Sequence, residues 1–205
     1  MWKDEYRQTA EDIVKYSALS YERMLVTAAG GNVSARIGDT VMVTRSGVSL
    51  REIGEGDLLV VDLRGNILHN PGNHRPSKET GFHLAIYNAR ESVRCVLHVH
   101  PPYVTAFSVN GVPFPRVTSG ARNKLSPAPM IEPLRSGSQE LLERVSETVL
   151  SSGEEVKALI LQSHGTVAFD ATMEDAFQTA ELMEDCARVA YLALQIGTGM
   201  PGEAK

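Results

Sequence analysis

The stretch VRCVLHVHPP, residues 93–102, joins an apolar run to two histidines that are separated by one residue, His98 and His100. The apolar run predicts a β-strand, and alternate side chains of a strand share one face at a spacing of roughly 6.5 Å. Pro101 and Pro102 end the strand because proline has no N–H for the hydrogen-bond ladder. We therefore expect both imidazoles at the C-terminal end of this strand, pointing the same way.

Two imidazoles at this spacing can chelate a divalent cation. Zn²⁺ takes about four nitrogen, oxygen or sulfur ligands, and a catalytic site usually takes three of them from the protein and leaves one position open. The alternative is a chance pair, in which one imidazole packs and the other meets solvent. His164 favours the metal site, because it directly follows the apolar strand expected at 158–161.

The other histidines are weaker candidates. His69 and His74 lie in a polar turn region, which indicates surface positions. His83 follows Glu79 by four residues and so shares its helix face, which favours a packing or supporting role over ligation.

Composition describes an ordinary globular protein. The 205 residues are 42% hydrophobic and carry a formal net charge of −5. We therefore expect no nucleic-acid partner, since there is no basic stripe, and no membrane span, since no run approaches roughly 18 apolar residues. The expected organisation is a single domain over residues 1–205, cytoplasmic, with Cys95 and Cys186 as reduced thiols in the core.

Helical and extended segments alternate along the chain without a regular strand–helix–strand repeat. The spacing of apolar residues predicts helices over about 4–26, from Pro76, and over about 138–151 and 173–196, and strands at 32–37, 41–44, 58–63, 66–68 and 158–161. The first four strands form two hairpins. Residues 110–136, rich in proline and glycine, are expected to be a long irregular connection. This pattern predicts a layered α/β domain with a mixed or mostly antiparallel sheet.

Glu79 is the candidate acid. It is expected in the first turn of the helix that follows Pro76, where the helix dipole favours a carboxylate. A carboxylate near a metal can ligate the ion or act as a base, and it can exchange these roles when substrate displaces it. The alternative is a carboxylate that only caps the helix.

Three short segments offer groups that bind anions. They are Gly30-Gly31-Asn32, Thr44-Arg45-Ser46-Gly47 and Ser77-Lys78. Backbone N–H groups at glycine turns and at a helix start bind anions, and hydroxyl and cationic side chains add to this. Beside a candidate metal site, these segments predict a small phosphorylated or otherwise acidic substrate.

Five motifs in this order resemble the class II aldolase/adducin family, and within it the zinc-dependent L-fuculose-1-phosphate aldolase group. The motifs are GGNVS at 30–34, TRSG at 44–47, PSKE at 76–79, HVHP at 98–101 and SHG at 163–165, so they cover nearly the whole chain. The resemblance implies a three-layer α/β/α fold with a central, largely antiparallel sheet. It also implies a homotetramer with active sites at the subunit interfaces.

The resemblance implies a role for each matching residue. His98, His100 and His164 match the ligands of Zn²⁺, or of another divalent metal such as Mn²⁺ or Co²⁺. Glu79 matches the family's acid/base, which can also ligate the ion before substrate arrives. The residues that match positions holding the substrate and its phosphate are Gly31, Asn32, Ser46, Gly47, Ser77 and Lys78.

The activity implied is that of a zinc-dependent lyase. It cleaves a phosphorylated ketose, similar to fuculose 1-phosphate, to dihydroxyacetone phosphate and an aldehyde through a metal-stabilised enediolate. Aldolases of this group often carry a second serine where Lys78 stands, and Arg45 adds another cation. These charges favour, as an alternative, a decarboxylase of a phosphorylated 3-oxo sugar acid, whose carboxylate they would recognise.

Two further alternatives fit less well. A sugar-phosphate 4-epimerase usually has aspartate at the position of Glu79. A non-catalytic, adducin-like module typically lacks the three histidines, all of which are present in this chain.

Overall fold

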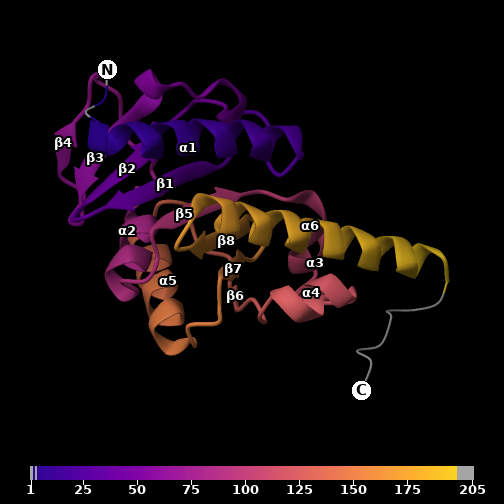
Figure 1. Cartoon of the computed structure of the whole chain (residues 1–205). Coiled ribbons are helices and arrows are strands. Elements are labelled where there is room, and N and C mark those ends of the chain that lie inside the picture. Colours follow the sequence, from indigo (N-terminus) through magenta and orange to yellow (C-terminus); the bar gives the residue numbers. More distant parts are fainter. Residues whose placement is uncertain (1, 3, 198–205) are drawn as a thin grey trace.

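The computed structural model describes Trp2 and residues 4–197 (Figure 1). Its elements are α1 (Asp4–Glu22), β1 (Asn32–Ile37), β2 (Thr40–Thr44), η1 (Leu50–Glu52), η2 (Glu55–Asp57), β3 (Leu58–Asp62), β4 (Ile67–His69), α2 (Thr80–Ala89), β5 (Cys95–Val99), α3 (Pro102–Val109), α4 (Ser119–Lys124), β6 (Met130–Ile131), α5 (Gln139–Ser151), β7 (Ala158–Leu161), β8 (Gly165–Asp170) and α6 (Met173–Gln195). The predicted domain of residues 1–205 also includes residues 1, 3 and 198–205, which lie outside the described residues.

One eight-stranded sheet runs in the order β4-β3-β2-β1-β5-β8-β7-β6. Every neighbouring pair is antiparallel except β6 and β7. Both predicted hairpins, β1–β2 and β3–β4, are confirmed. The strand that carries His98, β5, lies between β1 and β8, and its register places His98 opposite Asn32 on one side and Val167 on the other.

Helices cover both faces of this sheet, and each face has its own apolar cluster. On one face, residues of α1 and α6 pack with Leu97 and Val99 of β5. On the other face, residues of α2 and α5 pack with Val96. Because side chains alternate along a strand, His98 shares the face of Val96 and points toward α2. There its ring contacts Phe82 edge-on, with ring centroids 5.4 Å apart.

The predicted α/β fold with a mostly antiparallel sheet is confirmed, but the molecule is not a strict three-layer stack. The short helices α3 and α4 pack against α6, and they lie beside its C-terminal half in Figure 1. The turns η1 and η2 contact α1 instead of forming part of a layer.

Two expectations about local structure were wrong, and a third holds but was incomplete. The first helix ends at Glu22, four residues before the expected end at 26. Residues 110–136 are not irregular throughout, because they contain α4 and β6. Pro102 not only stops a strand but begins α3, since the first helical turn does not need the missing N–H.

Two remaining expectations concern the core and the membrane. Cys95 and Cys186 are both buried free thiols, as predicted. Within the described part of the chain, no helix combines the length and the apolar character needed to cross a membrane.

Candidate metal centre and active site

Three imidazoles from distant parts of the chain converge at one end of β5. His98 lies within that strand, His100 follows it, and His164 lies in the turn between β7 and β8. The Nε2 atom of His98 is 3.0 Å from Nε2 of His100 and 3.3 Å from Nε2 of His164. The ligand atoms of the three residues lie within 4.8 Å of one another, which fits a single cation among three nitrogen donors.

The imidazoles are in the protonation state that a metal requires. Burial lowers the pKa of His98 to about 3, and burial also lowers the pKa of His100 and of His164. The Nδ1 atom of His98 lies 2.9 Å from the carbonyl oxygen of Thr166. Nδ1–H therefore donates to that carbonyl, which leaves the lone pair of Nε2 facing the other two rings.

The Glu79 carboxylate completes this cluster. Its Oε2 lies 3.3 Å from Nε2 of His98, and its Oε1 lies 3.4 Å from Nε2 of His164. Burial favours the neutral acid, but the positive charge of the His98 ring in its protonated form and the hydrogen bond from Ser136 outweigh burial and hold the pKa of Glu79 below its ordinary value. The site therefore contains a carboxylate anion beside neutral imidazoles at neutral pH.

The expected position of Glu79 in the first turn of a helix was wrong. Glu79 is the N-cap residue of α2, and its side chain makes no capping hydrogen bond. The carboxylate turns toward the imidazoles instead of back onto the helix. The structure therefore does not support a residue that only caps the helix.

Two neutral side chains hold the carboxylate. Asn32 Nδ2 donates to Glu79 Oε2 at 2.9 Å, and the Ser136 hydroxyl donates to Glu79 Oε1 at 2.6 Å. Asn32 is among the residues predicted from sequence. Ser136 is not, and the one local signal is the run Ser136-Gly137-Ser138 directly before a helix, which resembles an ordinary turn.

A cavity of about 140 Å³ opens beside Glu79, His100 and His164. All six residues predicted to hold the substrate line it: Gly31, Asn32, Ser46, Gly47, Ser77 and Lys78. Gly31 has a φ of +80°, and a Cβ there would lie 2.9 Å from the carbonyl oxygen of His98, so only glycine fits. The fold thus brings the three predicted anion-binding segments together at the histidines.

The two cationic side chains at this cavity, Arg45 and Lys78, differ in whether a carboxylate is paired with them. The guanidinium of Arg45 is paired with Asp57, with 2.5 Å between Nε and Oδ1. Among the described residues, Lys78 has no such carboxylate partner. Its positive charge contributes to the lowered pKa of both His100 and His164, which places the ammonium close to the site. Lys78 is therefore the cation at this cavity whose charge no described carboxylate balances.

The remaining histidines lie outside this cluster, as predicted. His83 is fully buried, and its Nδ1 lies 2.7 Å from the hydroxyl oxygen of Ser34. His69 is exposed on β4 and contacts the ring of Trp2 edge-on. His74 is partly exposed.

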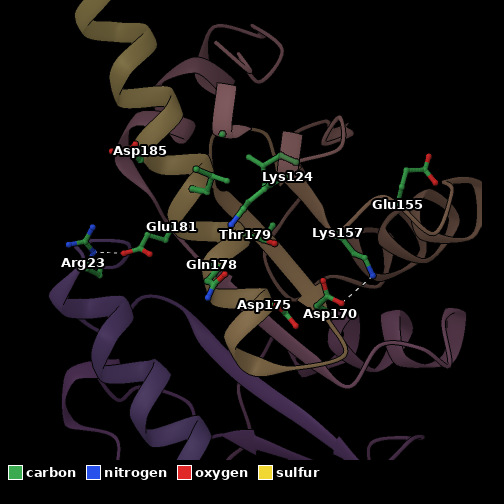
Figure 2. A pocket seen from close by; sticks show the side chains of 13 residues that line it. Arg23, Lys124, Glu155, Lys157, Asp170, Asp175, Gln178, Thr179, Glu181 and Asp185 are labelled. Atoms are coloured by element: carbon green, nitrogen blue, oxygen red, sulfur yellow. Dashed lines mark hydrogen bonds and ion pairs between the residues drawn. The ribbon is translucent and has the colours of Figure 1, made fainter. Parts of the chain in front are cut away.

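A much larger hollow lies elsewhere, between α4, α6 and β8 (Figure 2). It measures about 970 Å³ and is wide and polar. Two of its acidic residues are paired with basic ones, Glu181 with Arg23 and Asp170 with Lys157. Because it contains none of the converging histidines, the smaller cavity is the candidate active site.

The chain belongs to the class II aldolase and adducin family, because the family model "Class II Aldolase and Adducin N-terminal domain" matches residues 11–191. It is 33% identical over 181 residues to an L-fuculose phosphate aldolase of Methanococcus maripaludis strain S2, covering 88% of this chain and 95% of that protein. It is 32% identical over 190 residues to a 3-oxo-tetronate 4-phosphate decarboxylase of Haemophilus influenzae, covering 88% of this chain and 86% of that one.

Solved structures agree with this assignment. An L-fuculose 1-phosphate aldolase superposes with a TM-score of 0.85 at 26% identity, covering 100% of this chain and 92% of that chain. The family predicted from the five motifs is therefore confirmed, and so is the prediction of an enzyme of the class II aldolase type.

Proposed function

We propose that this chain is a lyase that uses a divalent cation, preferably Zn²⁺, to cleave a phosphorylated ketose similar to L-fuculose 1-phosphate. The products would be dihydroxyacetone phosphate and an aldehyde. The observation that carries the proposal is the convergence of three neutral imidazoles and one carboxylate at a cavity lined by hydroxyl groups and glycine backbone. The similarity to a named L-fuculose phosphate aldolase supports this choice of substrate class.

The donor set fits such a cation. The nitrogen atoms of His98, His100 and His164 would hold it, with Glu79 as a fourth ligand until substrate arrives. Imidazole suits zinc, and Mn²⁺ or Co²⁺ can replace it at many such sites. When bound, the cation supplies a Lewis acid toward the substrate oxygens.

The chain's own residues supply binding and proton transfer. Ser46, Ser77 and the backbone at Gly31 and Gly47 would hold a phosphate group. Their place in the lining of the cavity supports this role. The ionised carboxylate of Glu79 forms part of the same wall and is within reach of a bound substrate. Glu79 would take a proton from the substrate and return it, as a general acid–base group does.

We further propose a cytoplasmic homotetramer with active sites at the subunit interfaces. Large apolar side chains stay exposed at the end of α3, on α6 and directly after α6, where Val109, Leu192 and Ile196 are 57%, 49% and 78% exposed. Exposed apolar surface of this kind is typical of subunit contacts. Two buried free thiols, and no disulfide between them, suit a reducing compartment.

Lys78 favours a second candidate function, decarboxylation of a phosphorylated 3-oxo sugar acid. An unpaired ammonium at the cavity would bind a substrate carboxylate, and a decarboxylase of this substrate class is among the relatives. Lewis-acid activation of a substrate carbonyl serves either reaction. In each reaction, breaking the carbon–carbon bond leaves negative charge on the carbon next to the carbonyl group and on the carbonyl oxygen.

Product analysis separates the two functions. The purified chain, loaded with zinc, is given a panel of ketose 1-phosphates and phosphorylated 3-oxo acids, and dihydroxyacetone phosphate and CO₂ are followed separately. Dihydroxyacetone phosphate with an aldehyde supports the aldolase, and CO₂ from an oxo acid supports the decarboxylase. Turnover of neither class contradicts both proposals.

Substitution of Lys78 should act on substrate binding. Lys78→Ser is expected to raise KM for the acidic substrate about tenfold or more, because a hydrogen bond to a charged group contributes roughly 1.5–3 kcal/mol. Bound metal, measured by elemental analysis, should not change. Lys124→Ser removes the same charge from the distant large hollow and serves as the control. Unaltered kinetics in Lys78→Ser would exclude Lys78 from the site.

A further inference from the structure

Ser136 lies on the segment that joins β6 to α5, and its side chain forms a hydrogen bond with Glu79, 57 positions earlier in the chain. Its hydroxyl donates to Oε1 of Glu79 at 2.6 Å, while Asn32 donates to the other oxygen, Oε2. Ser136 also lines the candidate active-site cavity. Each oxygen of the carboxylate therefore has one neutral donor, and the two donors come from different parts of the fold.

The segment around Ser136 is held in place on both sides. Gly137 has a φ of +73°, and a Cβ there would lie 2.9 Å from the carbonyl oxygen of Lys78, so the loop backbone rests directly on the residue before Glu79. The backbone N–H of Ser138 donates to the carbonyl oxygen of Arg135 at 3.0 Å and closes a turn around Ser136. The position of Ser136 relative to Glu79 is thus determined by backbone contacts and does not depend on a flexible side chain.

We propose that Ser136 is a positioning residue that holds the Glu79 carboxylate in the orientation facing both the histidine cluster and the substrate cavity. Glu79 is 4% exposed, so water cannot easily replace a lost hydrogen-bond partner. Without the hydroxyl, the one contact that Oε1 keeps among the described residues is with the His164 ring, and the plane of the carboxylate can turn about its last side-chain bond. The inference rests on the proposed function, in which Glu79 both ligates the cation and moves the proton.

Two measurements on Ser136→Ala test this role. The affinity for Zn²⁺ or Co²⁺, measured by competition with a chelator, should fall about tenfold, since hydrogen-bond partners of metal ligands commonly contribute 10- to 100-fold. The kcat for the active substrate should fall about 10- to 100-fold, while KM stays within about twofold, because the serine acts through Glu79.

Matched variants isolate the hydroxyl group. Ser136→Thr keeps it, and both quantities should be within about threefold of those of the unaltered chain. Valine has the shape of threonine without the hydroxyl, so Ser136→Val should behave like Ser136→Ala. If the alanine variant does not fold, comparison of the threonine and valine variants still tests the role of the hydroxyl group. Ser138→Ala, two positions away, removes the helix cap and should lower thermal stability with metal affinity and kcat unchanged.

Equal metal affinity and kcat in the threonine and valine variants would overturn the inference. The metal measurement needs no substrate, so it separates this inference from the proposed reaction. A chain whose metal affinity depends on the Ser136 hydroxyl, but which cleaves no member of the substrate panel, would contradict the proposed reaction and leave the role of Ser136 supported.

Discussion

His98→Ala is expected to abolish stoichiometric zinc binding and, with it, turnover. The Nε2 atom of His98 lies 3.0–3.3 Å from donor atoms of His100, His164 and Glu79, so it occupies the centre of the cluster. Its removal leaves two imidazoles and a carboxylate with a gap between them. The loss of affinity should exceed the roughly 10- to 100-fold cost of altering a hydrogen-bond partner of a ligand. Elemental analysis and chelator competition measure it.

A second ligand and a remote histidine complete this test. His164→Ala should lose zinc in the same way, because its ring faces the same point. His69→Ala removes an exposed imidazole on β4, far from the cluster in the sheet order, and should bind zinc like the unaltered chain. Unchanged zinc occupancy in His98→Ala or His164→Ala would show that the three histidines do not hold the metal.

Glu79→Gln is expected to lose turnover while it keeps most of its zinc when fully loaded, although its zinc affinity should fall at least as far as that of Ser136→Ala. The amide has nearly the size of the carboxylate, so the three imidazoles keep their arrangement, but it cannot accept and return a proton at neutral pH. General acid–base groups typically contribute 10²- to 10⁴-fold to rate, so kcat should fall by about that factor. Steady-state kinetics on the zinc-loaded variant, normalised to its metal content, measures the effect.

Glu143→Gln is the matched control for this substitution. Glu143 is an exposed residue of α5, and the same chemical change there should leave kcat as it is. A Glu79→Gln variant with full kcat would remove Glu79 from the proton transfer. A variant that loses its metal as completely as His98→Ala would make Glu79 an essential ligand instead.

Much of the fold follows from local sequence patterns. The two hairpins form where apolar, strand-forming residues flank Gly38-Asp39 and Arg64-Gly65, because strand formers next to short turns pair with their neighbours in sequence. Helix α5 begins after Ser138, where serine precedes an apolar stripe. The short helices α3 and α4 have weaker local signals, since proline and glycine occur near both and they are stabilised by packing on α6.

The candidate site was predictable to the extent that its residues lie in recognisable motifs. His98 and His100 could be paired from their spacing alone, because a strand places residues i and i+2 on one face. His164 was added to them as a candidate ligand because it directly follows an apolar strand, and the resemblance to a family then assigned roles to all three histidines and to the anion-binding segments. Ser136 belongs to none of the motifs, which explains why it was missed.

By itself, the sequence determined most of the longer elements, the family and the types of residue that make up the site. Only the tertiary structure decided how these residues meet: it sets Asn32 opposite His98 through strand pairing and carries Ser136 to Glu79 from 57 positions away. The physical reason is the range of the forces involved. Backbone preferences and apolar periodicity act over a few residues, whereas burial of the sheet's two faces brings distant segments to the same point. At that point the surroundings keep the imidazoles neutral and Glu79 ionised.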